Sequence, residues 1–522
     1  MQLAATAIPP DLDAFLARER QRSSLRFITC GSVDDGKSTL IGRLLYESKL
    51  LFDDQIATLV TDSKRAGTQN GGLDFSLLVD GLAAEREQGI TIDVAYRFFA
   101  TSQRKFIVAD TPGHEQYTRN MATGASLCDL AIILVDARKG LLTQTRRHSV
   151  IVSMLGVRHV VLAINKIDLV GYSEAVFNRI RTDFQNFARD LGFDEICCIP
   201  VSALRGDNVV ARSAHTAWYE GPSLLEHLEA VEVENDSLRR PFRMAVQWVN
   251  RPSADFRGFS GLITSGTVST GDRVRAVLSG LEARVARITT HDGDLDRAGA
   301  GRSVTLLLDR EIDISRGELI CAAEAPATRA SDFRARLLWT GDGALVPGKS
   351  YLLRIGTRSV TATVRRPDYV LDINTLARHP ADTLRMNEMG FCQIVLDQPA
   401  AFDSYARSRE TGSFILIDRE SNDTLAMGFV ESISDGEPDQ DLGRPAPEIG
   451  QTGDRRRVGH RVGRILSWGV ISTIVTFGIA FAVTGDRSVA MTVAVAELAA
   501  QSALFWAHRQ AWQRVDRRPD RI

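Results

Sequence analysis

The chain has 522 residues, of which 44% are hydrophobic and 25% are charged, as in ordinary globular proteins. A chain of this length exceeds what one hydrophobic core supports, so three or more domains are expected. Its 63 Lys and Arg residues nearly balance its 65 Asp and Glu residues. This balance excludes a general basic field for nucleic acid, although a local basic patch stays possible.

The six cysteines are scattered along the chain, and the one close pair is Cys197 and Cys198. This pattern matches neither a disulfide framework nor a zinc-ligand spacing, so buried free thiols in a reducing cytosol are expected. The N-terminus has no basic stretch followed by an apolar core, and a signal peptide is not expected. Residues 1–24 are interpreted as an N-terminal extension of a cytoplasmic protein.

The apolar run Phe27–Cys30 predicts a buried strand, and the amphipathic run Thr39–Leu50 predicts a helix. The loop between them fits G-x-x-x-x-G-K-[ST], in which backbone N–H groups and the helix N-terminus converge on phosphate oxygens. Lys37 is expected to reach the β- and γ-phosphates and Ser38 to ligate Mg²⁺. The alternative is a glycine-rich turn with a solvated lysine. The residues predicted to bind nucleotide here are Gly31, Ser32, Val33, Asp34, Asp35, Gly36, Lys37, Ser38 and Thr39.

Residues 51–90 form a long, mostly polar stretch with few strand signals. A connection of this length is usually functional. Thr91 can bring a hydroxyl and a backbone N–H to Mg²⁺ and the γ-phosphate, which would order the segment only in the triphosphate state. Taken alone, this threonine would be interpreted as a strand-edge residue.

A second motif follows the predicted strand Lys105–Ala109. Asp110, at the carboxyl end of that strand, is expected to accept hydrogen bonds from the groups that ligate Mg²⁺. Gly113 can offer its N–H to the γ-phosphate, and His114 follows where an attacking water would lie. A solitary histidine is more often structural, but its place after D-x-x-G favours catalysis. The residues predicted to bind nucleotide in this motif are Asp110, Thr111, Pro112, Gly113 and His114.

A third motif sets base specificity. Two further apolar strands are predicted at residues 130–135 and 160–164, and the second ends in Asn165, Lys166, Ile167 and Asp168. The Asp168 carboxylate matches the two donors of guanine, N1–H and the exocyclic amine, whereas adenine offers no such pair. A further strand is predicted at residues 196–201. The backbone of the residues that follow it, Ser202, Ala203 and Leu204, can meet the guanine carbonyl oxygen.

Strands that alternate with helices over residues 25–235 predict an α/β domain with a mostly parallel sheet and a ligand at the carboxyl ends of its strands. The stretches GSVDDGKST, EREQGITID, DTPGHEQYTRNM, NKIDL and SAL resemble the motifs of translation-factor-type P-loop GTPases. Within these GTPases, the stretch LLVDGLAAEREQGITIDVAYRFF is most similar to the large GTP-binding subunits of ATP sulfurylase (CysN type). This resemblance covers roughly residues 20–435 and implies that His114 positions water, with Val33 and Ile90 as apolar gate residues beside it.

Residues 236–328 and 329–435 change to short alternating β runs separated by turns, which predicts two small all-β barrels. They resemble the second and third domains of the same GTPases, and they are expected to form surfaces that sense the nucleotide state. Their predicted strands are residues 242–249, 258–268, 273–277, 284–289, 350–355, 359–364, 390–396 and 412–418.

The C-terminal part departs from the family. Residues 436–459 are rich in Pro, Gly and Asp and read as a linker. Ile465–Thr484 holds twenty residues without a formal charge, enough to cross a bilayer as a helix. Val489–Ala507 is a second, weaker candidate, interrupted by Glu497. Arginines flank both ends, so residues 460–515 are predicted to form an α-helical transmembrane hairpin with both ends cytoplasmic, anchored at the inner face of the cytoplasmic membrane.

The alternative for this part is a soluble helical hairpin packed on the barrels. Residues 455–515 also resemble a small family of predicted membrane hairpins. Some relatives carry an adenylylsulfate kinase domain at this end, but no second G-x-x-x-x-G-K-[ST] follows residue 435, so that activity is not expected.

The resemblance implies a GTPase that uses GTP and Mg²⁺ and couples hydrolysis to adenylyl transfer from ATP to sulfate, giving adenylylsulfate and pyrophosphate. Because the base motif selects guanine, the transfer is expected on a separate small catalytic subunit. Two alternatives stay open: a translation-factor-like carrier of aminoacyl-tRNA, disfavoured by the near-neutral charge, and a membrane-tethered regulatory GTPase without a sulfurylase partner. No nucleic-acid partner is expected.

Overall fold

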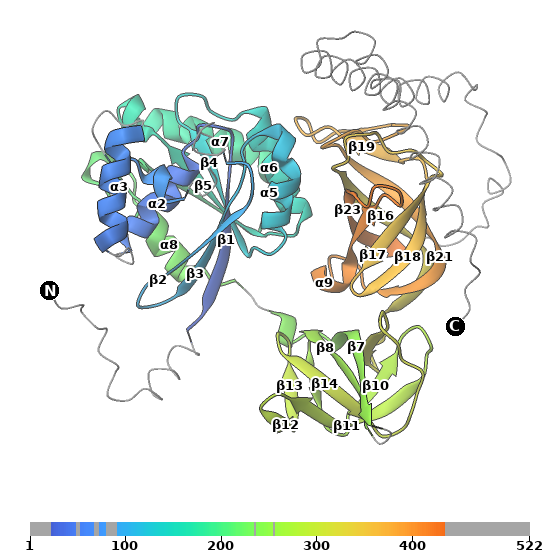
Figure 1. Ribbon diagram of the computed structural model, residues 1–522. Helices are drawn as coiled ribbons and strands as arrows, with labels where there is room; N and C mark the ends of the chain where they lie inside the picture. Colours follow the sequence, from blue (N-terminus) through green and yellow to red (C-terminus); the bar gives the residue numbers. More distant parts are fainter. Residues whose placement is uncertain are drawn as a thin grey trace, which may run out of the picture. The chain divides into compact units, whose positions relative to one another are not determined.

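The computed structural model describes residues 22–48, 53–66, 73–79, 91–233, 236–253 and 256–433. They form an α/β domain followed by two all-β domains (Figure 1), which confirms this part of the predicted fold class. The predicted linker, the predicted hairpin at residues 460–515 and Ile90 lie outside the described residues. Within the described ranges, no helix is long and apolar enough to span a membrane.

The α/β domain is built on a six-stranded sheet with the strand order β2-β3-β1-β4-β5-β6. All neighbouring strands pair in parallel except β2, which runs antiparallel to β3 at one edge. The carboxyl ends of five strands therefore meet at one edge of the sheet, where ligands bind in open α/β sheets. The strands are β1 (Ser24–Cys30), β2 (Ala95–Ala100), β3 (Lys105–Asp110), β4 (Leu130–Asp136), β5 (His159–Asn165) and β6 (Glu195–Pro200).

Helices cover both faces of this sheet, with α2 and α8 on one face and α5 and α6 on the other (Figure 1). Short 3₁₀ turns lie at several strand ends. The α-helices are α2 (Lys37–Glu47), α3 (Asp53–Ala66), α5 (Thr118–Ala125), α6 (Thr143–Met154), α7 (Glu174–Ala188) and α8 (Leu224–Ala230). The 3₁₀ turns are η1 (Phe75–Leu78), η2 (Glu115–Tyr117), η3 (Ile167–Val170), η4 (Arg189–Leu191), η5 (Ala214–Thr216) and η6 (Asp236–Leu238).

Two helices differ from the prediction. Helix α2 begins at Lys37 rather than Thr39, because Gly36, with a left-handed φ of 92°, ends the loop directly before it. Helix α3 lies within the stretch that was predicted only as polar. Its signals are two acidic residues in the first turn and buried Leu59 and Ser63 one helical turn apart.

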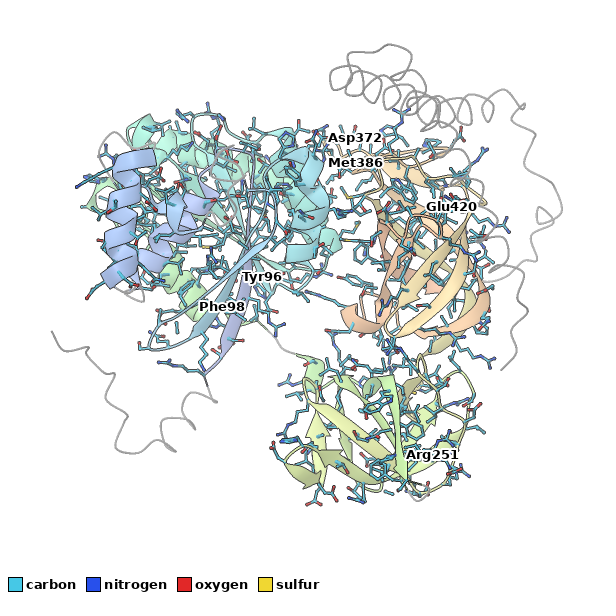
Figure 2. The ribbon with its side chains drawn as sticks, in the orientation of Figure 1. Tyr96, Phe98, Arg251, Asp372, Met386 and Glu420 are labelled. Carbon is cyan, nitrogen blue, oxygen red and sulfur yellow. The ribbon has the colours of Figure 1, made fainter. Side chains whose placement is uncertain are left out.

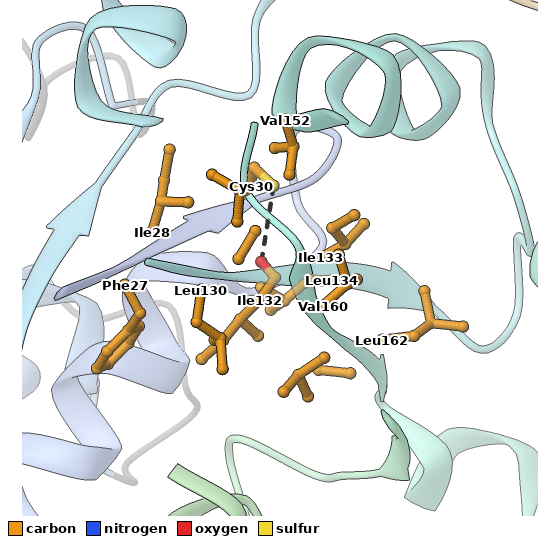
Figure 3. Packing of buried hydrophobic residues seen from close by; sticks show 14 of the residues in the cluster. Phe27, Ile28, Cys30, Leu130, Ile132, Ile133, Leu134, Val152, Val160 and Leu162 are labelled. Atoms are coloured by element: carbon orange, nitrogen blue, oxygen red, sulfur yellow. Dashed lines mark hydrogen bonds between the residues drawn. The ribbon is translucent and has the colours of Figure 1, made fainter. Parts of the chain in front are cut away.

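The centre of the sheet is apolar on both faces (Figure 3). Every residue of β4 is buried, because helices cover the sheet on both sides. Cys30 belongs to this core, and its Sγ lies 3.7 Å from the carbonyl oxygen of Ile132. Burial raises the pKa of Cys30 to about 12, so the thiol is protonated and inert. Cys197 and Cys198 are only partly buried, contrary to expectation, because β6 is an edge strand.

The second domain is a barrel whose sheet has the order β10-β15-β7-β8-β14-β11-β12 and is closed by pairing of β10 with β11. The predicted strand at residues 258–268 is divided, because Gly266 turns the chain with a φ of 70°. The strands are β7 (Arg243–Ser253), β8 (Phe256–Ser265), β9 (Thr267–Ser269), β10 (Arg273–Ala276), β11 (Glu282–Thr290), β12 (Gly293–Leu295), β13 (Arg297–Gly299), β14 (Ser303–Leu308) and β15 (Leu319–Ala322).

The third domain is a second barrel, with the order β16-β23-β22-β17-β18-β21-β19-β20 and closure by pairing of β16 with β21. Of its two long strands, β21 was predicted only in part, at residues 390–396, and β16 was not predicted. The elements are β16 (Thr328–Trp339), β17 (Ser350–Ile355), β18 (Arg358–Val364), β19 (Tyr369–Leu371), β20 (Arg378–His379), β21 (Met389–Phe402), α9 (Arg409–Gly412), β22 (Ser413–Ile417) and β23 (Thr424–Ile433).

The third domain packs against the α/β domain through apolar side chains. Leu338, Met389, Tyr405 and Phe429 belong to the same hydrophobic cluster as the core of the α/β domain. The Tyr405 hydroxyl also donates a hydrogen bond to the carbonyl oxygen of Leu155, at 2.9 Å. The two domains are therefore joined by a contact of the kind found inside domains.

A buried ion pair joins the two barrels. Arg243 in β7 and Asp403 after β21 form two parallel hydrogen bonds of 2.9 and 3.0 Å, and both side chains are almost completely buried. Arg243 also donates to the carbonyl oxygen of Ala325, and Thr411 donates to the Asp403 carboxylate. Burial alone would raise the pKa of Asp403, but the hydrogen bonds from Arg243 lower it below its ordinary value.

We expect Asp403→Ala to lower the free energy of unfolding by about 3–5 kcal/mol, because the guanidinium of Arg243 would be left buried without its counter-charge. Urea unfolding followed by tryptophan fluorescence measures this change. The exposed pair of Arg287 and Asp294 provides the matched control, since Asp294→Ala should cost less than about 1 kcal/mol. Equal effects of the two substitutions would contradict the expectation.

Candidate functional site

The loop that follows β1 has a backbone conformation that depends on glycine. Gly31, Asp34 and Gly36 all have positive φ, at 148°, 67° and 92°. A Cβ added at Gly36 would lie 2.4 Å from Nδ2 of Asn165, and one added at Gly31 would lie 2.7 Å from the carbonyl oxygen of Leu134. Only glycine fits at these two positions, so the loop can bring its N–H groups close to a ligand.

Lys37, the first residue of α2, lies buried beneath this loop. Its Nζ donates to the carbonyl oxygens of Ser32, at 2.8 Å, and Gly31, at 3.3 Å. Burial lowers the pKa of Lys37, and the carboxylates of Asp110 and Asp35 oppose that shift. An ammonium group has three donors, so it can hold the loop closed and still donate to a phosphate oxygen.

Gly113 follows β3 and lies against the same loop. A Cβ at this position would come within 2.5 Å of the Lys37 Nζ and 2.9 Å of the Gly31 carbonyl oxygen. This close approach fits a backbone N–H that meets the same phosphate as Lys37. Pro112 and Thr111 are buried behind it, and the Thr111 hydroxyl donates to the main chain of β1.

His114 is half-buried and caps η2, with its Nδ1 accepting a hydrogen bond from the N–H of Gln116 at 3.2 Å. A neutral imidazole that accepts at Nδ1 carries its proton on Nε2. The Nε2–H can therefore donate to a water or a phosphate oxygen. Val33, the predicted gate residue in the loop, is also half-buried.

The three predicted metal-site residues lie together. The Ser38 hydroxyl donates to Asp110 Oδ2 at 2.9 Å and lies 3.4 Å from the hydroxyl of Thr91. Thr29 donates to the other carboxylate oxygen of Asp110 at 3.2 Å. Burial raises the pKa of Asp110, and the neighbouring Lys37 opposes that rise. Hydroxyl and carboxylate oxygens of this kind suit Mg²⁺ bound together with phosphate, so the set fits the predicted ion.

Asn165 connects the phosphate loop to the predicted base-binding loops. Its Nδ2 donates to the carbonyl oxygen of Asp35 at 2.8 Å, and its Oδ1 accepts from the N–H of Ala203 at 3.0 Å. Lys166 follows in a left-handed conformation and donates to the carbonyl oxygen of Asp34. The ends of β1, β5 and β6 are therefore held at fixed positions relative to one another.

Asp168 lies in η3 beside these loops, with 7% of its side chain exposed and Arg205 Nε at 3.4 Å. Ser202 is buried and Leu204 is 41% exposed, as suits a loop that lies against a flat ring. Arg43 of α2 supports this loop from below, because its guanidinium donates to the carbonyl oxygens of Leu204 and Arg205.

Asp136, which ends β4 between the two predicted nucleotide loops, was not among the predicted site residues. Arg138 donates to both of its carboxylate oxygens, at 3.0 and 2.6 Å, and Lys166 lies 3.0 Å away. Although burial would raise the pKa of Asp136, these hydrogen bonds hold it well below the ordinary value. The available signal was its position, since Asp136 directly follows a predicted strand of the parallel sheet.

His148 is a second residue that the sequence did not reveal. It projects from α6, is completely buried, and accepts a hydrogen bond at Nδ1 from the Gly31 N–H at 3.1 Å. Burial lowers the pKa of His148 to about 3, and the nearby cations Lys37 and Arg147 act in the same direction. The imidazole is therefore neutral, as its role as an acceptor requires.

Neutral His148 predicts a loss of stability in acid. Its pKa is about 6.5 in an unfolded chain and about 3 in the folded protein, so the unfolded state binds the proton first. Its contribution is complete above pH 6.5 and falls by at most about 1.4 kcal/mol per pH unit as the pH drops toward 3. Urea unfolding at about pH 7 and about pH 5 should show a loss of about 2 kcal/mol from this group.

The control for this prediction is His148→Asn, whose carbonyl oxygen can accept from the Gly31 N–H without titrating. The neighbouring Asp35, whose pKa burial raises to about 6, changes stability in the opposite direction over the same range. Comparing the pH dependence of the two proteins removes that contribution, which both share. An unchanged pH dependence in His148→Asn would show that His148 is not the group responsible.

Comparisons with known families match three parts of the chain. The family of the Elongation factor Tu GTP binding domain matches residues 22–236. The GTP-eEF1A C-terminal domain-like family matches residues 332–431. A family described as predicted membrane protein matches residues 464–513.

Individual relatives match most of the chain. The sulfate adenylyltransferase subunit 1 of Methylorubrum extorquens is 56% identical, over 81% of this chain and 90% of its own length. That of Chromobacterium violaceum is 55% identical, over 82% and 90%. The bifunctional enzyme NodQ of a Rhizobium species is 56% identical over 82% of this chain, which spans 66% of that relative.

A solved structure of sup35 complexed with GDP is also similar, at 22% identity and a TM-score of 0.37, over 79% of this chain and 95% of that one.

Proposed function

The chain belongs to the family of sulfate adenylyltransferase subunit 1, and we propose that it hydrolyses GTP in support of the reaction of ATP with sulfate. That reaction gives adenylylsulfate and pyrophosphate. The described residues hold one phosphate loop, and the base-reading Asp168 suits guanine. The adenylyl transfer is therefore assigned to a separate small catalytic subunit, with which this chain forms a heteromer.

The observation that carries the proposal is the position of Asn165. Its side chain forms hydrogen bonds with both loops: with Asp35 in the phosphate loop and with Ala203 in the loop that follows β6. One ligand with a triphosphate at one end and a purine at the other can therefore contact both loops. Asp168 and Lys37 then contact opposite ends of the same molecule.

The site residues take separate roles in hydrolysis. Lys37 and the N–H groups of the loop bind and orient the β- and γ-phosphates, and Gly113 donates to the γ-phosphate. Ser38 and Thr91 would hold Mg²⁺ with support from Asp110, and this ion would neutralise charge on the phosphate oxygens. His114 positions the attacking water, while Val33 and Ile90 exclude other water from it.

Sulfate-dependent release of pyrophosphate from ATP tests this function, measured with the chain and its small subunit, with and without GTP. We expect GTP to increase the release. If GTP changes nothing, the sulfurylase role is rejected. Retention of aminoacyl-tRNA on filters would then favour the carrier function, and GTP hydrolysis without either effect would favour a regulatory GTPase.

We expect His114→Ala to slow GTP hydrolysis by about 100-fold, because general acid–base and water-positioning groups contribute at least that factor. The affinity for GTP should change by less than about twofold, since Lys37 and Asp168 carry the binding. Single-turnover hydrolysis and calorimetry measure the two quantities. The exposed His215 gives the control, since His215→Ala should change neither. Loss of binding without loss of rate would reverse the assigned roles.

The C-terminal residues 460–515 are proposed to anchor the protein at the inner face of the cytoplasmic membrane as a helical hairpin. The support is the uncharged stretch Ile465–Thr484 and the match of this region to a family described as predicted membrane protein. Fractionation of cells that express the full chain tests this, compared with a chain ending at residue 435. Equal recovery of both in the fraction that needs no detergent would reject the anchor.

A further inference from the structure

The third domain contacts the loop that carries His114 through one polar side chain. Nδ2 of Asn387 donates a hydrogen bond of 2.9 Å to the carbonyl oxygen of Glu115, the residue directly after His114. Glu115 is also the first residue of η2, whose cap is His114 itself. A shift of this carbonyl would therefore move the backbone that orients the imidazole.

Asn387 is held firmly on its own side of the contact. It lies in the turn before β21, next to Met386, which is labelled in Figure 2, and it is almost completely buried. Its N–H donates to the carbonyl oxygen of Trp339 at 2.7 Å, and its φ of 67° is left-handed. Asparagine tolerates this conformation better than most residues do, and its amide supplies the donor.

The side chain of Glu115 contacts helix α6 of its own domain. Its carboxylate lies 3.1 Å from the guanidinium of Arg147 in α6, and Arg147 donates to Gln144 at 2.7 Å. Gln144 in turn lies 2.9 Å from His148, which accepts from the N–H of Gly31. The residue after His114 therefore contacts both the third domain and the helix that supports the phosphate loop.

We propose that Asn387 is a positioning residue for GTP hydrolysis, so that the catalytic loop is complete only when the third domain is docked on the GTPase domain. This inference rests on the proposed role of His114. The apolar contact made by Leu338, Met389 and Phe429 supplies the docking energy, and the Asn387 amide supplies the geometry. A water-positioning group displaced by about 1 Å loses much of its effect on the rate.

Two substitutions separate the donor from the fold. Asn387→Asp keeps the shape and the left-handed backbone, but its carboxylate cannot donate to a carbonyl oxygen. Asn387→Gly keeps the left-handed backbone and removes the side chain altogether. Because it introduces no charge, it remains informative if the buried carboxylate of Asn387→Asp prevents folding. We expect each to slow single-turnover GTP hydrolysis by the full chain about tenfold and to change the GTP affinity less than about twofold.

The pH dependence gives a readout that a purely structural role would not move. A protonated carboxyl can donate, so the deficit of Asn387→Asp should shrink between about pH 8 and about pH 5.5, while that of Asn387→Gly should stay constant. The titratable or charged groups beside the contact are His114, Glu115 and Arg147 from one domain and Glu388 from the other. The wild-type protein contains all four and is the reference.

Asn422→Asp is the matched control, because Asn422 is a left-handed asparagine in an exposed turn of the same domain. In a His114→Ala background, Asn387→Asp should slow hydrolysis no further. Wild-type rates in both Asn387 variants, or a full additional loss without His114, would overturn the proposal. If instead His114→Ala hydrolyses GTP as fast as wild type, the proposed role of His114 fails, which is a separate result.

Discussion

Lys37→Ala should reduce the affinity for GTP at least about 1,000-fold, because each hydrogen bond to a charged group contributes about 1.5–3 kcal/mol and Lys37 is proposed to contact two phosphates. The same substitution removes the two hydrogen bonds that close the loop, from Nζ to the carbonyl oxygens of Gly31 and Ser32. The loop would then lose both its charge and its shape. Calorimetric titration with GTP in the presence of magnesium measures the change.

Two comparisons make this result interpretable. Lys349→Ala removes a lysine that also forms a close ion pair, with Asp418 in the third domain, and it should leave GTP affinity unchanged. Circular dichroism of Lys37→Ala should match wild type, because the strands of the sheet do not depend on Nζ. Tight GTP binding by Lys37→Ala would mean that the loop does not hold the triphosphate.

Residues at strand ends explain why much of the site could be predicted from the sequence. Asp110 ends β3, Asp168 lies in the turn that follows β5, and Ser38 lies at the start of the helix that follows the loop after β1; parallel strands bring such ends together. Local spacing therefore determines where these side chains lie once the sheet forms. The same reasoning applies to Asp136, which ends β4.

Residues whose role comes from partners distant in the sequence carry no local signal of that role. His148 looks like any residue of a helix until its ring meets the N–H of Gly31, 117 positions away. Asn387 looks like a turn residue until it meets the carbonyl oxygen of Glu115, 272 positions away. The first contact depends on how a helix packs on the sheet and the second on how two domains pack, and the pattern of apolar and polar residues along one element encodes neither.

In the proposed function Asp168 selects the base, and Asp168→Asn should reverse that selection. The carboxylate accepts from both guanine donors, N1–H and the exocyclic amine. An amide in its place would direct its own NH₂ at the guanine amine, leaving two donors opposed. Xanthine carries a carbonyl oxygen at that position and keeps N1–H, so it matches an amide.

We therefore expect Asp168→Asn to bind xanthosine triphosphate in preference to GTP, with a change in the ratio of affinities of about 10⁴-fold, since hydrogen-bonding sites discriminate by that order. Calorimetry with GTP, xanthosine triphosphate and ATP measures it, and ATP should bind weakly to both proteins.

Arg205→Ala is the control, because Arg205 is exposed and pairs with Asp168 at 3.4 Å without a proposed contact to the base. It should weaken GTP binding by less than about tenfold, since exposed ion pairs contribute under about 1 kcal/mol. Unchanged preference in Asp168→Asn, or tight ATP binding by wild type, would place base recognition elsewhere, because adenine lacks the pair of adjacent donors that this carboxylate matches.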